Sequence, residues 1–144
     1  MKAAVALVLR LVLGAFWIWA GLTKIVGHFD AGPFLTAAVS RSAVAPEAVR
    51  LALTGAIVHV ALPHVVAVNL IVPWLELAAG LSILLGIAIA WGVAGAAAMS
   101  VLFLMCGAVG TNPLLLFGAV LLAMSYPYAR AWTLHAPRAP AATI

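Results

Sequence analysis

Long apolar stretches alternate with short polar or glycine- and proline-rich breaks along most of the chain. A membrane-spanning helix needs about 20 mostly apolar residues. On this basis the pattern predicts four spans, over about residues 4–24, 65–90, 92–110 and 114–130. Short turns are expected at Trp91-Gly92 and at Thr111-Asn112-Pro113, the latter because proline disfavours a helical conformation in the residue before it.

The connection between the first two predicted spans, residues 28–64, is long and more polar. Pro46 followed by Glu47 indicates a helix start, with proline in the first turn and a carboxylate near the positive end of the helix. We expect a helix over 46–62 that lies on or dips into the membrane surface, because its apolar part is too short to span. A broken fifth span is the alternative. The tail, residues 133–144, is expected to be frayed.

Composition narrows the class of protein. Of the 144 residues, 67% are hydrophobic and 7% are charged, and the mean hydropathy is +1.27, whereas a soluble domain is about 45–50% apolar and about 25% charged. Too few polar side chains are present to cover a water-soluble surface, which argues against a soluble enzyme, a disordered protein or a disulfide scaffold. We therefore predict one all-α integral membrane domain, residues 1–144, a four-transmembrane-helix bundle with a long, partly helical first connection on the outer side.

The net charge of +4 is interpreted as a signal for the orientation of the chain in the membrane, not as a sign of an acidic binding partner. The cations are scattered and form no basic face, so nucleic acid is not expected to bind. Those near the two termini slightly outnumber those at the opposite ends of the spans, so both termini are predicted to be cytoplasmic. Arg10 interrupts the first apolar stretch, and Trp17 and Trp19 stand where a signal-peptide cleavage site needs small residues, so we expect an uncleaved first span.

One face of the first predicted helix combines cations with glycines. The residues on this face follow one another at spacings of 4, 3, 4 and 3, and they are Arg10, Gly14, Trp17, Gly21 and Lys24. The spacing is that of a helix-pair seam, and glycines allow another backbone to approach closely. The two cations are therefore expected to point at protein or at a polar cavity.

The second predicted span carries the matching acid. Asn69, Glu76 and Gly80 share one of its faces, and a carboxylate at membrane depth must be protonated, paired or open to water. Glu76 is expected near mid-membrane, within reach of Arg10 or Lys24. We predict a buried polar cluster of Arg10, Lys24, Asn69 and Glu76. It could bind a quinone headgroup or relay protons, with Trp17 beside a ring-shaped ligand, or it could be a structural ion pair that fixes helix register.

Other reactive residue types give weaker patterns. His59 and His64 lie about 140° apart around a helix with Pro63 between them, so they are not expected to share a metal or a haem. The single cysteine, Cys106, has no internal disulfide partner and is expected to be a buried apolar residue. No metal site and no catalytic residues are predicted.

Several motifs resemble the DoxX family of small membrane proteins. Arg10, Gly14, Phe16, Gly21 and Lys24 are similar to its first-helix pattern. The stretch WLELAAGLSILLG, with Glu76, Gly80 and Gly86, resembles its second-helix signature, and GAVGTNPLLLFGAVLLA resembles the turn between its third and fourth helices. These motifs stand in the family's order, and the resemblance that they carry extends over about two thirds of the chain.

The resemblance implies a four-helix protein of a prokaryotic inner membrane, associated with quinone-linked sulfur oxidation or oxidative-stress complexes. DoxD-type relatives of the family belong to thiosulfate:quinone oxidoreductase. The more distant relative MauE is tied to disulfide maturation, and the single cysteine of this chain, Cys106, weakens the similarity to MauE. We expect a subunit that docks on partners carrying the redox cofactor, or on a second copy. Its quinone or lipid site is expected at Arg10, Trp17, Lys24, Asn69 and Glu76.

Two alternatives remain open. The first is a non-catalytic structural or assembly subunit of a larger respiratory or photosynthetic complex, which the glycine- and alanine-rich faces favour. The second is a small transporter, which would need a continuous polar path. In each case the chain is not expected to be catalytic alone or to bind a cofactor covalently, although it could serve as a subunit of an oxidoreductase.

Overall fold

The computed structural model describes residues 2–44 and 46–129, and these residues form helices and turns without a strand. The elements in chain order are α1 (Lys2–Val26), α2 (Gly32–Arg41), a 3₁₀ turn η1 (Ser42–Val44), α3 (Glu47–Ala56), a π-helical turn η2 (Ile57–Ala61), α4 (Val65–Leu85), α5 (Ile89–Met105), α6 (Asn112–Met124) and α7 (Tyr126–Ala129). The all-α prediction is confirmed. The predicted tail and residue 130 lie outside the described residues.

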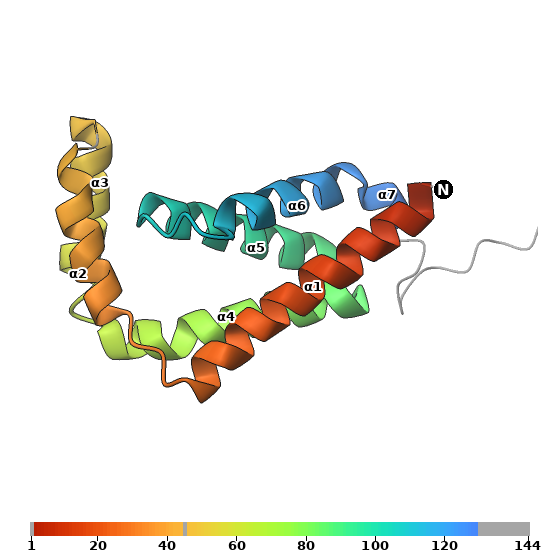
Figure 1. Ribbon diagram of the computed structural model, residues 1–144, viewed down its shortest axis with the longest axis horizontal. Coiled ribbons are helices and arrows are strands. Elements are labelled where there is room, and N and C mark those ends of the chain that lie inside the picture. The colour runs from red at the N-terminus through yellow and green to blue at the C-terminus, as the bar shows by residue number, and fades with distance from the viewer. Residues whose placement is uncertain (1, 45, 130–144) are drawn as a thin grey trace, which may run out of the picture.

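The helices form two groups that meet at one end of the molecule (Figure 1). In the bundle, α1 and α4 lie side by side over most of their lengths, and α5 and α6 pack as an antiparallel pair against them. The second group, residues 29–44 and 46–61, is a helical hairpin with the short segment that leads into it, and we call it the arm. It runs across the end of the bundle, whereas α7 and the start of α1 lie at the opposite end.

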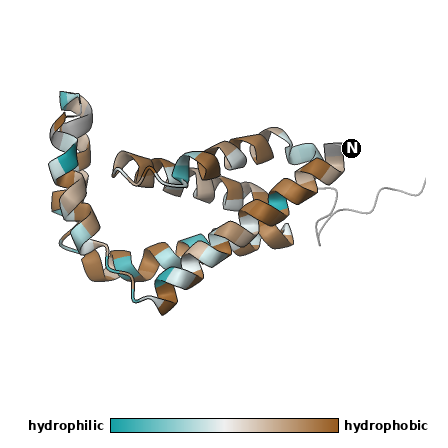
Figure 2. Ribbon diagram, in the orientation of Figure 1, coloured by the Kyte–Doolittle hydropathy of each residue, from teal (hydrophilic) through white to brown (hydrophobic). Residues whose placement is uncertain are grey.

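Within residues 2–44 and 46–129, two helices are long and apolar enough to cross a membrane, α1 from Ala3 onward and α4. The 21 residues of α4 span about 32 Å at about 1.5 Å per residue, close to the hydrocarbon thickness of about 30 Å. Helices α5 and α6 are shorter, with 17 and 13 residues. Most residues of the bundle helices are hydrophobic (Figure 2), and the large hydrophobic side chains exposed on them include Leu70, Trp74, Trp91, Leu114 and Met124.

The turn between α4 and α5 differs from the prediction. It falls at residues 86–88, where Gly86 adopts a left-handed conformation with φ 73° and the Ser82 hydroxyl donates to the Ile87 carbonyl at 2.7 Å. Glycine is the usual residue at such a helix end because it has no Cβ to clash. Trp91 and Gly92 therefore belong to the first turns of α5, and Gly92 allows close packing against Ser82.

The remaining boundaries also shift. Helix α5 ends five residues before the predicted end at 110, and α6 begins at Asn112 with Pro113 in its first turn, a position where the fixed φ of proline suits a helix. The 46–62 segment consists of α3 and η2, and α2 is an additional helix in the connection that was expected to be partly helical. Leu35, Ala38, Leu53 and Ile57 give the arm its own small core.

Contact between α1 and α4 depends on three glycines. A Cβ at Gly80 would lie 2.6 Å from the Ile18 nitrogen, one at Gly14 would lie 2.8 Å from the Leu84 nitrogen, and one at Gly21 would lie 2.7 Å from the Pro73 oxygen. The two backbones therefore touch directly, as the 4-3-4-3 pattern predicts. Arg10 and Trp17 are buried on the same face of α1.

The Gly80→Ala substitution should separate α1 from α4, because the added methyl group meets backbone atoms that cannot rotate away. We expect the free energy of unfolding of the solubilised protein to fall by about 2 kcal/mol, as for other overpacked sites. Gly95→Ala is the matched control, since no atom lies within 4 Å of its added Cβ. It should be neutral or raise stability by up to about 1 kcal/mol. Equal stabilities for the two variants would contradict the close α1–α4 contact.

Candidate functional site

An ion pair joins the last turn of α1 to the middle of α4. The Lys24 Nζ lies 2.6 Å from Oε1 and 2.7 Å from Oε2 of Glu76, so both carboxylate oxygens accept from one ammonium. Lys24 follows Gly21 by three residues and Glu76 precedes Gly80 by four, so the close backbone contacts bring both side chains to one seam. The Glu76 side chain is 1% exposed and that of Lys24 is 26% exposed.

Aromatic rings flank the exposed side of this pair. The Lys24 Nζ lies 5.8 Å from the ring centre of Phe29 and 5.6 Å from that of Phe103, within the range of cation–π attraction. A lysine ammonium has three N–H donors, and the two oxygens of the single Glu76 carboxylate, which lie on the same side of Nζ, engage at most two of them. One N–H remains for an acceptor on a bound molecule.

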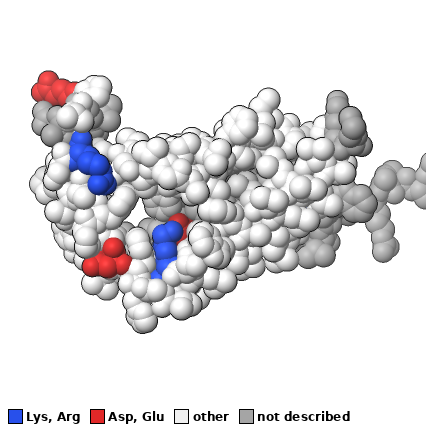
Figure 3. All heavy atoms as spheres, in the orientation of Figure 1, with Lys and Arg blue, Asp and Glu red and all other residues white. Residues whose placement is uncertain are grey.

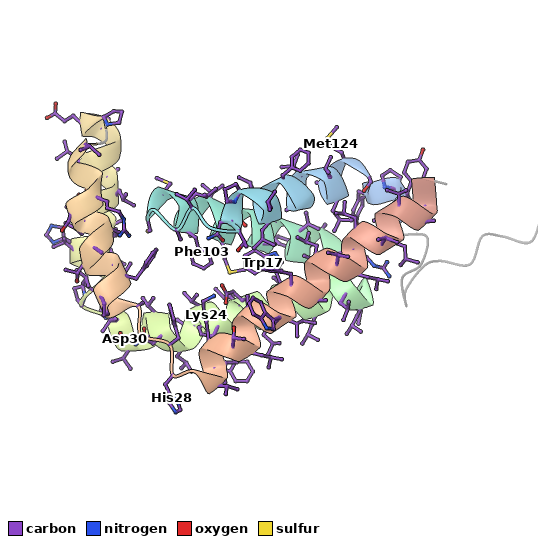
Figure 4. All side chains as sticks on the ribbon, in the orientation of Figure 1. Trp17, Lys24, His28, Asp30, Phe103 and Met124 are labelled. Carbon is purple, nitrogen blue, oxygen red and sulfur yellow. The ribbon has the colours of Figure 1, made fainter. Side chains whose placement is uncertain are left out.

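The pair lies in the wall of a hollow of about 300 Å³ between α1, the base of the arm and the α5–α6 turn. In Figure 3 the front surface is recessed there, with positive and negative atoms inside the recess. Figure 4 shows Trp17, Lys24 and Phe103 in the space between α1 and α5, whereas His28 points away from it. The ring-bearing residues of the wall are Phe16, Trp17, Trp19, Phe29, Phe34 and Phe103.

Polar groups at the mouth of this aromatic pocket are mostly engaged with the backbone. The Thr23 hydroxyl donates to the Trp19 carbonyl at 2.9 Å, and the Asn112 amide donates to the Ala108 carbonyl at 2.7 Å. Lys24 is thus the charged donor that the pocket offers on its otherwise apolar wall. An apolar wall with one or two placed polar groups is typical of small-molecule sites, which range from about 300 to about 1,000 Å³.

Trp17 lies in the pocket wall. The sequence pattern predicts this residue beside a ring-shaped ligand. It is 1% exposed, and its indole Nε1 has no hydrogen-bond partner among the described residues. Leaving such a donor unsatisfied costs about 1–3 kcal/mol. Helix packing places Trp17 at this position despite that cost.

Arg10 does not join the predicted polar cluster. It precedes Lys24 by 14 residues on the same helix, which is about 21 Å along the axis. Its Nη1 donates instead to the Ala129 carbonyl at 2.8 Å, in a buried contact that ties α7 to α1. Glu76 therefore pairs with Lys24, and Arg10 holds the opposite end of the bundle together.

Asn69 anchors the arm rather than the ion pair. Its Oδ1 accepts from the Ala31 backbone at 2.8 Å, and its Nδ2 donates to Asp30 at 3.3 Å. Asp30 in turn accepts from the Gly32 backbone at 2.9 Å, at the start of α2. Asn69 and Lys24 also line a second hollow, of about 320 Å³, on the other side of Lys24.

Three aromatic residues that complete the pocket wall were not predicted from the sequence. Phe29 and Phe34 come from the start of the arm and Phe103 from α5, and only the way the arm folds back brings them together. Their one signal in the sequence is that Phe29 and Phe34 flank the Gly-Pro break after Lys24. His59 and His64 are exposed, and among the described residues no three His, Cys, Asp or Glu side chains could hold a metal ion together.

No protein-family model matches the chain, and neither a curated protein nor a solved structure matches it. The candidate function therefore rests on the geometry of the aromatic pocket, together with the resemblance of the sequence motifs.

Glu76→Gln should destabilise the protein, because it leaves the partly buried Lys24 ammonium without its counter-charge. We expect the free energy of unfolding to fall by about 3 kcal/mol, the low end for a broken buried pair. Glu47→Gln is the matched control at the exposed start of α3, where a carboxylate contributes less than about 1 kcal/mol. The double variant Lys24→Met/Glu76→Gln should recover much of the loss, and an additive double variant would argue against coupling.

Proposed function

We propose that this chain is an integral membrane subunit that binds a quinone in the aromatic pocket beside Lys24 and Glu76. The observation that carries this proposal is the position of the pair: a buried carboxylate and a partly exposed ammonium lie between apolar helices, with the ammonium facing an aromatic pocket. Ionisable groups at membrane depth mark functional sites by default.

The proposed setting is a prokaryotic inner membrane crossed by α1 and α4, with α5 and the continuous α6–α7 segment as the two shorter crossings of the bundle. The hydrophobic exterior of the bundle supports it, as does the distribution of charge: in Figure 3 the charged side chains lie on the arm and in the recess, and not over the visible face of the bundle. The arm would then lie along the outer surface, because it runs across the bundle's end. The termini would be cytoplasmic, in agreement with the positive-inside rule.

A quinone matches the pocket in shape and in hydrogen bonding. Its flat ring fits between aromatic side chains, and each favourable ring pair adds about 0.5–1.5 kcal/mol. One quinone carbonyl oxygen would accept the remaining Lys24 N–H, while Glu76 keeps the ammonium charge balanced. An apolar tail would leave through the open side of the pocket toward lipid.

We further propose that this subunit shapes the quinone site and that a partner subunit supplies the electrons. The resemblance to DoxX-like proteins supports this division of labour. The exposed apolar side chains of α4, α5 and α6 offer surfaces that lipid, a partner subunit or a second copy would cover.

One observation favours a purely structural role instead. The glycine contacts of α1 and α4 place Lys24 and Glu76 opposite each other whether or not a ligand binds, and a buried ion pair can serve to fix helix register. The chain would then be an accessory subunit of a larger membrane complex.

Quinone binding distinguishes these roles. We expect the purified wild-type protein in lipid nanodiscs to bind a short-chain benzoquinone, measured by calorimetry. The Lys24→Met/Glu76→Gln double variant should bind it at least about tenfold more weakly, because it loses the charged donor without leaving an unpaired charge.

A matched pair of phenylalanine variants tests the pocket itself. Phe103→Leu removes a ring from the pocket wall and should weaken binding, whereas Phe117→Leu changes an exposed ring of α6 outside it and should not. A wild-type protein that binds no benzoquinone, or variants that all bind alike, would favour the accessory subunit.

A further inference from the structure

The arm is a separately packed part of the chain. Its helices make their main contacts with one another. The buried residues of its core belong to the arm, while Val65 and Val68 of α4 and Cys106 pack against that core from outside. At its base, the arm is tied to α4 through the hydrogen bonds of Asn69 to Ala31 and Asp30. A part with its own core and few bonds to its neighbours can open locally without unfolding the rest.

A second connection joins the far end of α2 to the α5–α6 turn. The Arg41 Nη2 donates to the Cys106 carbonyl at 2.8 Å, and its guanidinium lies 5.6 Å from the Phe34 ring centre. Phe34 is itself part of the pocket wall. Arg41 thus links the arm, the aromatic wall and the turn that closes the other side of the pocket.

The α5–α6 turn is shaped to receive this guanidinium. Gly107 has φ +85°, and a Cβ at this position would lie 2.6 Å from the Arg41 Nε. Cys106 packs partly buried against the core of the arm. The carbonyl and the side chain of Cys106 therefore both face the arm, one through a hydrogen bond and the other through packing.

We infer that the arm is a gate at the end of the aromatic pocket and that Arg41 is the latch that holds it shut. Phe29 and Phe34 make the arm's part of the wall, while the recess in Figure 3 opens on the side of the molecule, across its long axis. With the latch closed, a ligand reaches Lys24 from the side, through lipid. With the latch open, the pocket also opens toward the outer aqueous phase. The identity of the ligand rests on the proposed function, whereas the gate does not.

The only cysteine of the chain reports directly on the latch. In full-length protein in nanodiscs, Arg41→Gln should raise the rate at which a charged, membrane-impermeant maleimide labels Cys106 by about five- to tenfold, the effect expected for the loss of one solvent-exposed hydrogen bond. Arg41→Lys should restore slow labelling in part, because it keeps a charged donor. Ser40→Ala is the control, since the neighbouring Ser40 hydroxyl bonds only within α2, to Thr36.

Quinone exchange gives a second, independent measurement. Arg41→Gln should raise the association and dissociation rates of a water-soluble, tail-less benzoquinone in the same proportion, and should leave unchanged those of a long-tailed quinone supplied in the lipid. A change in the dissociation rate alone would mean that Arg41 touches the ligand rather than the gate.

The outcomes separate the two proposals. Equal labelling of Cys106 in the wild type and in Arg41→Gln would overturn the gate, whatever the quinone results. Faster labelling without any benzoquinone binding to the wild type would leave the gate standing and remove the quinone.

Discussion

The pairing of the Lys24 ammonium with the Glu76 carboxylate is the constraint on which the rest of the structure depends. Glu76 is nearly inaccessible, and a carboxylate removed from water needs a cation and hydrogen bonds to remain charged. That requirement fixes where α4 meets the last turn of α1. The contact in turn needs glycine at positions 14, 21 and 80, because any larger residue there would push the two backbones apart. Helices α5 and α6 then pack against a pair whose register is already set.

The two members of the pair have unequal surroundings, and this inequality gives the site its chemistry. Glu76 is 1% exposed at the bottom of the pocket wall, with both oxygens turned to Lys24, so its role is to balance charge. Lys24 faces both Glu76 and the aromatic pocket, so it can hold its counter-ion and still donate to a ligand. A neutral acceptor is therefore the better partner, because an anionic ligand would compete with Glu76 for the same ammonium. The quinone proposal follows from this preference as well as from the shape of the pocket.

The sequence was sufficient to predict the all-α class, the glycine-lined face of α1 and the need of Glu76 for a partner. It could not choose between Arg10 and Lys24, because both lie on the same face of α1 and the depth of Glu76 was known only to within a few residues. The turn at Trp91-Gly92 was wrong because two glycines compete there, and only packing shows that Gly86 turns the chain while Gly92 contacts Ser82. Phe29, Phe34 and Phe103 escaped notice because their proximity depends on how the arm folds back.

The distribution of polar groups gives the two ends of the bundle different roles. At one end, Arg10 uses its charge internally, on the carbonyl at the end of α7, and so closes the bundle. At the other end, Lys24 and Asp30 lie at the base of the arm, and Arg41 lies at the far end of α2. Lys24 and Arg41 bond to other elements, and Asp30 accepts from the Gly32 backbone at the start of α2. In a chain with 7% charged residues, such a concentration is costly in an apolar setting unless water reaches it. The polar groups gather where the arm meets the bundle, whereas the glycine contacts of α1 and α4 hold the apolar remainder together.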